Sequence, residues 1–407
     1  MKDKKSGVGE EPVDYLEKGF FHKVLLLFHG PAAWSSWQVG LGGLLLACLV
    51  FIIWSLITKD KAVALAAGLI LVLYMLSDAW LLRSLPVQEI SFGPWQSQLF
   101  ALALPRFFVA SMSSAITFFL GDGWGLIIMA TGQLIGSLAL AYGTVIEPFR
   151  LIMTFLDIET DRLPDNAAPI RILHISDLHI ERLTFREEKL LELIRHTQPD
   201  LILITGDYLN LSYTNDPQAH AQVRQLLGNI FAPYGVFATL GSPLVDIREV
   251  VTPLFDGLSV RLLVNEWEEI QLGDDRCVVL LGLDCSHHLP TDRRQLADLV
   301  MASPNTGPRI LLYHAPDLMV EASQHEVDLY LCGHTHGGQV RLPGYGAILT
   351  SSQLGKRYEM GLYRSGRTHM YVSRGVGLEG LSAPRVRFLA PPEITLVTMH
   401  GNLPNKP

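Results

Sequence analysis

The sequence predicts an α/β protein in two parts, with a transmembrane region of four helices followed by an α/β domain. Four apolar stretches of about 20 residues follow one another in the first third of the chain. Beyond residue 169, short apolar runs typical of strands alternate with amphipathic runs typical of helices. Several of these predicted strands lead into aspartate or histidine, which indicates a site at one edge of a sheet.

Composition supports a membrane-bound part and argues against one class of function. Of the 407 residues, 49% are hydrophobic and 18% are charged, below the roughly 25% charged residues of soluble domains. The mean hydropathy is +0.26. The net charge of -8 argues against binding that neutralises phosphates, so we expect no nucleic-acid partner. The 4 cysteines show no CxxC spacing and are expected to be reduced thiols.

The apolar stretches have the length that a helix needs to cross the hydrocarbon core of a bilayer. A signal peptide has a shorter apolar region, and four such helices in a row are hard to bury in a soluble fold. We therefore expect a multi-pass protein of the cell membrane, with the lipid bilayer as a partner. The stretches are residues 38–58, 62–82, 98–120 and 124–146. Tryptophans at or near their ends are expected to be interfacial anchors, namely Trp34, Trp37, Trp54, Trp80, Trp95 and Trp124.

Basic residues predict the orientation of the membrane region. One side would carry most of the lysines and arginines, and the other only Lys59 and Lys61. Because basic loops stay in the cytoplasm, both termini and the α/β domain are expected on the cytoplasmic side. The residues on that side are Lys2, Lys4, Lys5, Lys18, Lys23, Arg83, Arg150 and Arg162.

Two charged residues fall inside the apolar stretches. Asp78 lies near the end of the second stretch, and Arg106 lies about two turns into the third. We expect them to form an ion pair, because an unpaired charge in lipid is costly. A path for ions or protons is the functional alternative, but no chain of further carboxylates follows.

The pattern of elements predicts the division of the chain. Residues 1–37 form a cytoplasmic segment, 38–146 the four helices, 147–168 a linker with a first strand, and 169–400 the α/β domain. The predicted strands of this domain are residues 170–175, 200–205, 235–240, 277–283, 309–314 and 327–332, and the predicted helices are 184–197, 216–230 and 291–302. Residues 339–397 are richer in strands and turns, which fits a core of two mixed sheets.

Carboxylates and imidazoles stand at the ends of four predicted strands. Ligands of open α/β sheets bind beyond the carboxyl ends of strands, so these side chains are expected to meet. Oxygen and nitrogen ligands together suit one or two divalent transition metals. A lone histidine in a strand is more often a core residue, but this ordered series is specific. The predicted metal ligands are Asp177, His179, Asp207, His314, His334 and His336.

The series Asp-x-His, Gly-Asp, His, Gly-His-x-His resembles the calcineurin-like metallophosphoesterase superfamily over residues 170–400. The stretches "GGQVRLPGYGAI", "YVSRGVGLEG" and "APPEITLVTMH" are similar to its membrane-associated bacterial subgroup. The resemblance implies an αββα sandwich of two mixed sheets and two divalent ions of manganese, iron or zinc. It implies that Asp177, His179 and His336 hold one ion, that His314 and His334 hold the other, and that Asp207 bridges them. The implied activity is hydrolysis of phosphomonoesters, phosphodiesters or pyrophosphates, including lipid-linked ones, by a metal-bound hydroxide.

One motif departs from the family. The usual Gly-Asn-His-Asp turn is replaced by Gly241-Ser242-Pro243-Leu244, so the amide ligand and the histidine acid are absent. Proline cannot supply a proton. Either the enzyme works without this acid or with a substitute such as His287 or His288, or activity is limited to activated esters, or the domain is a receptor or scaffold that binds metal or phosphate. The catalytic acid therefore stays unassigned, and the two histidines would otherwise be exposed loop residues.

Arginines in the C-terminal region could bind phosphate. Arginine suits bidentate recognition of phosphate oxygens. Arg341 and Arg374 adjoin glycine turns and are the predicted substrate contacts. The remaining arginines fit a solvated basic surface or contacts to anionic headgroups.

Overall fold

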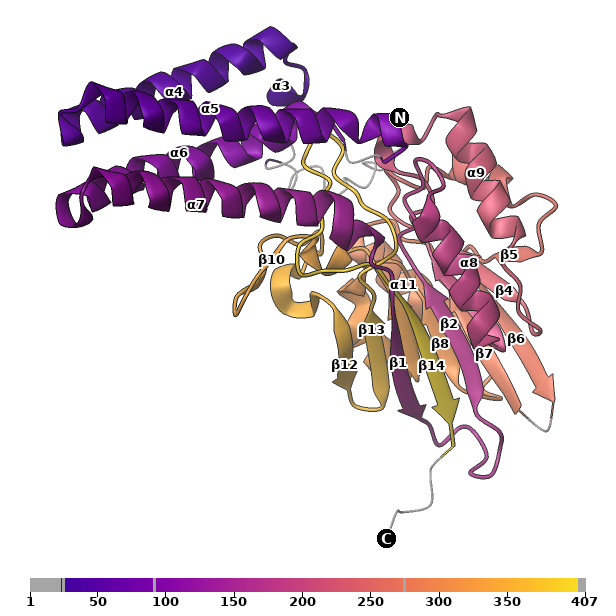
Figure 1. Cartoon of the computed structure of the whole chain (residues 1–407). Helices are drawn as coiled ribbons and strands as arrows, with labels where there is room; N and C mark the ends of the chain where they lie inside the picture. The colour runs from indigo at the N-terminus through magenta and orange to yellow at the C-terminus, as the bar shows by residue number, and fades with distance from the viewer. Residues whose placement is uncertain (1–22, 24–25, 91–92, 274–275, 402–407) are drawn as a thin grey trace, which may run out of the picture.

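The computed structural model describes residues 23, 26–90, 93–273 and 276–401 (Figure 1). Most of the predicted N-terminal segment 1–37 lies outside these residues. Four long helices come first, and each is long and apolar enough to cross a membrane, as expected. They lie side by side and project away from the rest of the molecule (Figure 1). They are α4 (Ser36–Thr58), α5 (Lys61–Ser84), α6 (Trp95–Leu120) and α7 (Asp122–Ala141), preceded by a short α3 (His29–Ala32).

The expected ion pair joins α5 and α6. Arg106 contacts Asp78, and both side chains are buried. Arg106 also donates to the side chain of Gln133 at 2.7 Å and to Ser137 at 2.8 Å. Ser137 in turn donates to Asp78 at 2.7 Å, so the acid has two partners from other helices. The prediction of a structural pair is confirmed.

Trp54 does not occupy the expected interfacial position. Its ring is fully buried among α4, α5, α6 and α7, and its Nε1–H donates to the carbonyl of Ala110 at 2.9 Å. The bundle needs a large apolar side chain there, and the indole N–H finds a backbone acceptor inside the bundle.

A short irregular segment connects the bundle to the α/β domain. After α7 the chain passes through a π-turn, η2 (Tyr142–Ile146), and a 3-10 turn, η3 (Glu147–Phe149). The next element, β1 (Ile152–Glu159), is the predicted first strand. It pairs in parallel with β14 (Glu393–His400), the last strand of the chain. The domain is therefore closed by strands from both of its ends.

Two six-stranded mixed sheets form the α/β domain, as expected. The first sheet has the order β1-β14-β2-β3-β4-β5, and the second has the order β12-β13-β9-β8-β7-β6. The remaining strands of the first sheet are β2 (Ile170–Ile175), β3 (Leu201–Thr205), β4 (Val236–Thr239) and β5 (Val260–Leu262). Those of the second are β6 (Glu266–Gly273), β7 (Arg276–Gly282), β8 (Arg309–Leu312), β9 (Leu329–Cys332), β12 (Gly361–Ser365) and β13 (Thr368–Val372). A small hairpin joins β10 (Arg341–Leu342) and β11 (Gly346–Ala347).

Three apolar clusters define the four layers of this domain. Residues such as Leu203 of the first sheet and Leu312 of the second pack together between the sheets. The outer face of the first sheet is covered by α8 (Phe185–Thr197) and α9 (Pro217–Gly228), through Leu190 and Val223 among others. The outer face of the second is covered by α11 (Leu289–Ala302) and α12 (Met319–Gln324). The αββα sandwich is confirmed, and a short α10 (Arg248–Val251) follows β4.

Candidate metal centre

Both sheets deliver candidate ligands to the same edge. In the first sheet, β2 leads to Asp177 and His179, and β3 leads to Asp207. In the second, β8 leads to His314, and β9 leads to His334 and His336. The parallel pairing of β2 with β3 and of β8 with β9 places these strand ends together.

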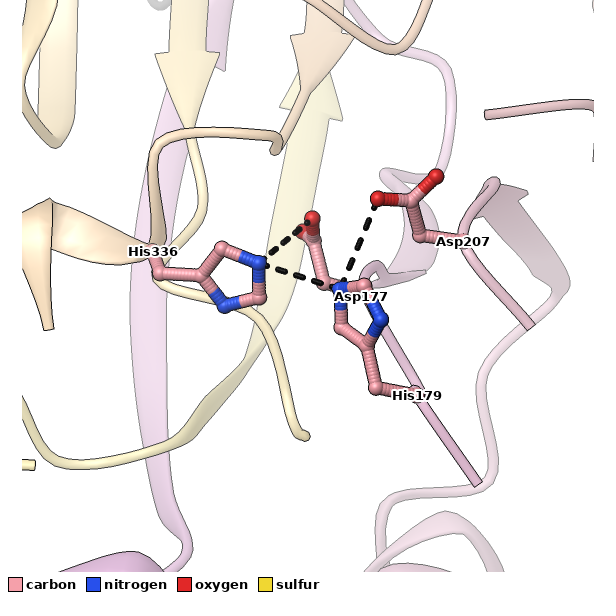
Figure 2. A group of neighbouring side chains, drawn as sticks. All are labelled: Asp177, His179, Asp207 and His336. Carbon is pink, nitrogen blue, oxygen red and sulfur yellow. Dashed lines mark hydrogen bonds and ion pairs between the residues drawn. The ribbon is translucent and has the colours of Figure 1, made fainter. Parts of the chain in front are cut away.

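The six side chains form two groups that share Asp207. One group contains Asp177, His179, Asp207 and His336, and the other contains Asp207, His314 and His334. Within each group one ligand atom per residue lies within 4.8 Å of the others, and all six residues are buried. Figure 2 shows the first group, with the side chains pointing toward one another. The structure thus brings together every predicted ligand, while their binding of metal stays a prediction.

The spacing of the ring nitrogens suits a bound cation. His179 Nε2 lies 3.0 Å from His336 Nε2, and each is 3.4 Å from a carboxylate oxygen, of Asp207 and Asp177 respectively. In the second group, His314 Nε2 lies 3.2 Å from Asp207 Oδ2 and 3.2 Å from His334 Nδ1. Such converging lone pairs and carboxylates repel one another unless protons or a cation lie between them.

Backbone conformation also marks these residues. Five of the six have a positive φ, which is uncommon for residues other than glycine. The angles are 51° at Asp177, 42° at His179, 58° at Asp207, 69° at His334 and 51° at His336. Strained backbone of this kind clusters at functional sites. Gly333 permits the close approach, because a Cβ there would lie 2.0 Å from Asp177 Oδ2.

Two acidic residues that the sequence analysis missed support the site. Glu379 Oε2 lies 3.2 Å from His179 Nδ1. Asp246 accepts the backbone N–H groups of Asp207, Tyr208 and Gly241 at 2.7, 2.9 and 2.8 Å. Burial, reinforced by the nearby Asp207 carboxylate, raises the pKa of Asp246 to about 7. The only sequence signal was position, since Glu379 lies in "GVGLEG" and Asp246 follows the altered Gly-Ser-Pro turn.

The electrostatics of the site favour positive charge. Burial opposes protonation of His314, but Asp207 and Asp177 outweigh it and raise the pKa of His314 to about 10. Burial likewise opposes protonation of His179, whose pKa rises to about 9 beside Glu379 and Asp207. In contrast, burial lowers the pKa of His334 and His336, and the neighbouring His314 and His179 lower it further. Two carboxylates that attract positive charge beside two neutral imidazoles are a donor set that fits divalent cations.

The altered turn faces the second group. The Ser242 N–H donates to Asp207 Oδ1 at 2.7 Å, and Ser242 Oγ lies 3.2 Å from His334 Nδ1. His287 is buried, so the interpretation as an exposed loop residue is wrong for it, and its ring lies 5.0 Å from that of His334. His288 is half-buried and contacts Thr291 through Nδ1 at 2.7 Å.

The predicted substrate arginines already have acidic partners. Arg341 contacts Glu359 at 2.9 Å and the carbonyl of Gly337 at 2.7 Å. Arg374 pairs with the buried Glu393. A third arginine, Arg387, is fully buried with its guanidinium 3.4 Å from His336 Nδ1. Substrate binding by Arg341 and Arg374 stays a prediction.

Comparison with known proteins identifies the family. The family model "Calcineurin-like phosphoesterase" matches residues 170–338. The chain is 32% identical over 287 residues to the uncharacterized metallophosphoesterase YkuE of Bacillus subtilis, covering 67% of this chain and 93% of YkuE. It is 31% identical to the phosphodiesterase YaeI of Escherichia coli, covering 58% and 84% of the two chains. It is 25% identical to the UDP-2,3-diacylglucosamine pyrophosphatase LpxG of Chlamydia muridarum, covering 62% and 90%.

The chain therefore belongs to the calcineurin-like metallophosphoesterases and is a phosphoester hydrolase. Members of this family use divalent metals, as expected for the side-chain groups described above. The expected resemblance to the superfamily is confirmed.

Proposed function

We propose that this protein is a membrane-anchored phosphoesterase that works with two divalent cations. Asp177, His179 and His336 would hold one cation, His314 and His334 the other, and Asp207 would bridge them. The observation that carries the proposal is the membership of Asp207 in both ligand groups. A carboxylate has two oxygens and can bridge two ions, whereas an imidazole cannot.

Two cations so placed would polarise a phosphoester and lower the pKa of a water between them. The protein fixes which atoms face them. His314 Nδ1 lies 2.6 Å from the Thr205 carbonyl, so Nδ1–H donates there and Nε2 is left as the ligand atom. Glu379 orients His179 in the same way, through Nδ1. Ser242 offers a hydroxyl beside the second group where the family has an amide, a neutral oxygen that could contact a cation or a water.

The substrates we propose are phosphomonoesters, phosphodiesters or pyrophosphates that include lipid-linked esters. The four apolar helices support a substrate at a membrane surface, and LpxG is named as a pyrophosphatase of a diacylated sugar nucleotide. Basic residues support the cytoplasmic side. A non-catalytic receptor is not favoured, because the relatives with assigned activities are named as a phosphodiesterase and a pyrophosphatase.

Metal counting combined with hydrolysis tests the proposal. The full chain in detergent, loaded with manganese, should hold two ions per chain and hydrolyse bis(4-nitrophenyl) phosphate. Asp207→Asn should bind fewer ions and lose turnover, while Asp157→Asn, an exposed carboxylate on β1, should retain both. Full metal content and turnover in Asp207→Asn would contradict a bridging role. A wild-type protein that binds two ions but cleaves no ester would contradict the proposed catalysis.

A further inference from the structure

We infer that the β10–β11 hairpin, residues 341–348, is a second membrane contact that dips into the interfacial layer of the bilayer beside α7. The hairpin carries three large exposed side chains: Leu342, Tyr345 and Ile348 are 48%, 61% and 45% exposed. Leu389, 43% exposed, follows Phe388, which pairs with the hairpin. Several large exposed apolar side chains on one small hairpin and the segment paired with it favour an interaction surface.

Contacts between the hairpin and the membrane bundle fix its position. The Arg341 N–H donates to the carbonyl of Phe388 at 2.9 Å, and the Phe388 ring packs edge-on against Tyr142 at 5.9 Å. Tyr142 directly follows α7. The hairpin lies beside the last part of α7 in Figure 1. It is therefore attached at the domain-proximal end of α7.

The length of α7 sets the depth. Its 20 residues span about 30 Å, which equals the thickness of a typical hydrocarbon core. If Asp122 lies at the far surface of that core, Tyr142 lies at the near surface, where tyrosine is enriched. The hairpin that packs on Tyr142 through Phe388 therefore lies at the level of the headgroups.

Charged and aromatic groups at the hairpin fit anionic headgroups. Lys356 Nζ lies 3.5 Å from the centre of the Tyr345 ring and donates to the Tyr345 carbonyl at 2.8 Å. Arg357 beside it is exposed. Glu359 is already engaged by Arg341 and Lys356. Aromatic rings with neighbouring basic side chains are typical of the boundary between membrane and water.

The occupant we propose is the bilayer rather than a second copy of the chain. The hairpin is linked to the end of α7 through Phe388 and Tyr142, and Lys356 beside it is a basic group that suits anionic lipid. Three exposed apolar side chains are few for a stable dimer, whose interface needs about 800 Å² from each partner.

The hairpin also adjoins the candidate metal centre. A Cβ on Gly338 would lie 2.4 Å from Ala347 Cβ, so the hairpin packs closely on the loop that carries His336. The segment after β11 returns to the second ligand group, where His334 Nε2 lies 3.3 Å from the Ser351 carbonyl. This step rests on the proposed function: a hairpin at the lipid surface would present the candidate metal centre to esters held there.

A nitroxide label at Tyr345→Cys tests the depth, in the full chain reconstituted into phosphatidylethanolamine–phosphatidylglycerol nanodiscs. Cys48 is exposed and is first changed to serine, whereas Cys277, Cys285 and Cys332 are buried. Met301→Cys is the control, since Met301 is 76% exposed near the end of α11, which leads to the start of β8, at the edge opposite the site. We expect the label at 345 to collide more with oxygen and less with aqueous nickel chelate than the label at 301. Equal collision ratios at the two sites would overturn the inference, and so would dipolar broadening between labels at 345, which would indicate a second copy.

A kinetic measurement tests the consequence for lipid substrates. Leu342→Asp and Ile348→Asp should lower the rate of hydrolysis of hexadecyl 4-nitrophenyl phosphate in vesicles by at least an order of magnitude. Both variants should hydrolyse soluble bis(4-nitrophenyl) phosphate at the wild-type rate. Equal rates for wild type and both variants on the vesicle ester would overturn the role of the hairpin in presenting substrate. If the wild type cleaves neither ester, the proposed function fails, whereas the label depth still decides the membrane contact.

Discussion

Substitution of Asp246 should disturb the geometry of the candidate metal centre before it unfolds the domain. Within the part of the chain that the structure describes, Asp246 makes no hydrogen bond to a ring nitrogen of the predicted ligands. Its Oδ2 accepts N–H groups from Asp207 and Gly241, and its Oδ1 accepts the N–H of Tyr208. These bonds hold Asp207 at φ 58° and fix the turn that carries Ser242.

The size of the effect follows from these three bonds. Asp246→Ala leaves three buried N–H groups without their acceptor, at about 1–3 kcal/mol each and about 3–9 kcal/mol in all. That range is comparable with the whole stability of a domain, about 5–15 kcal/mol. We therefore expect the loops at Asp207 and Gly241 to rearrange before the sheets unfold. Asp246→Asn keeps one acceptor oxygen for two of the three groups and should cost about 1–3 kcal/mol.

The assay is manganese content per chain together with turnover and the thermal midpoint. We expect the order wild type, Asp246→Asn, Asp246→Ala for metal content and for turnover, with the alanine variant holding fewer than two ions. Asp157→Ala removes an exposed carboxylate from the same domain and should change neither the metal content nor the turnover. An alanine variant with two ions, full turnover and an unchanged midpoint would refute the argument that Asp246 positions Asp207.

Three further perturbations follow from other contacts. Arg106→Met should destabilise the bundle by about 3–5 kcal/mol because the buried Asp78 loses its charged partner, and adding Asp78→Asn should recover most of the loss. Steric-trapping measurements of stability check this prediction, and additive losses in the double variant would contradict a direct pair. Glu379→Gln should weaken metal affinity about 10–100-fold by releasing His179, as measured by equilibrium dialysis with manganese, and an unchanged affinity would contradict its orienting role. If His287 replaces the missing family acid, His287→Gln should slow hydrolysis of phenyl esters by up to about 10²–10⁴-fold and should slow hydrolysis of 4-nitrophenyl esters much less. Equal effects on both esters would argue against that role.

The predictable parts of the structure are those encoded by local patterns. The strands before Asp177, Asp207 and His334 are short apolar runs, and each of these polar residues is the second residue beyond the end of its strand. The four long helices follow from uninterrupted hydropathy, and the pair of Asp78 with Arg106 is expected from the cost of an unpaired charge in apolar surroundings. In each case a short stretch of sequence suffices to state the expectation.

The missed features depend on segments that are distant along the chain. Asp246 binds the backbone of Asp207 from 39 residues away, and Glu379 reaches His179 from the C-terminal region. The burial of His287 arises because the loop after β7 folds toward His334, a contact between segments that no local period reports. Trp54 looked like an anchor because it lies near a helix end, but its rotational position on α4 turns it inward.

The connection between bundle and domain is a structural contact as well as a covalent one. Glu147, which follows the π-turn after α7, is fully buried and accepts the N–H groups of Leu389 and Ala390. Two residues earlier than Leu389, the Arg387 N–H donates to the carbonyl of Gly143 at 2.9 Å, and its guanidinium lies 3.4 Å from His336 Nδ1. Arg387 therefore contacts both the π-turn that follows α7 and a predicted metal ligand. Because buried polar contacts of this kind leave little freedom between the parts, the orientation of the candidate site relative to the four-helix bundle is set by the fold and not by a flexible tether.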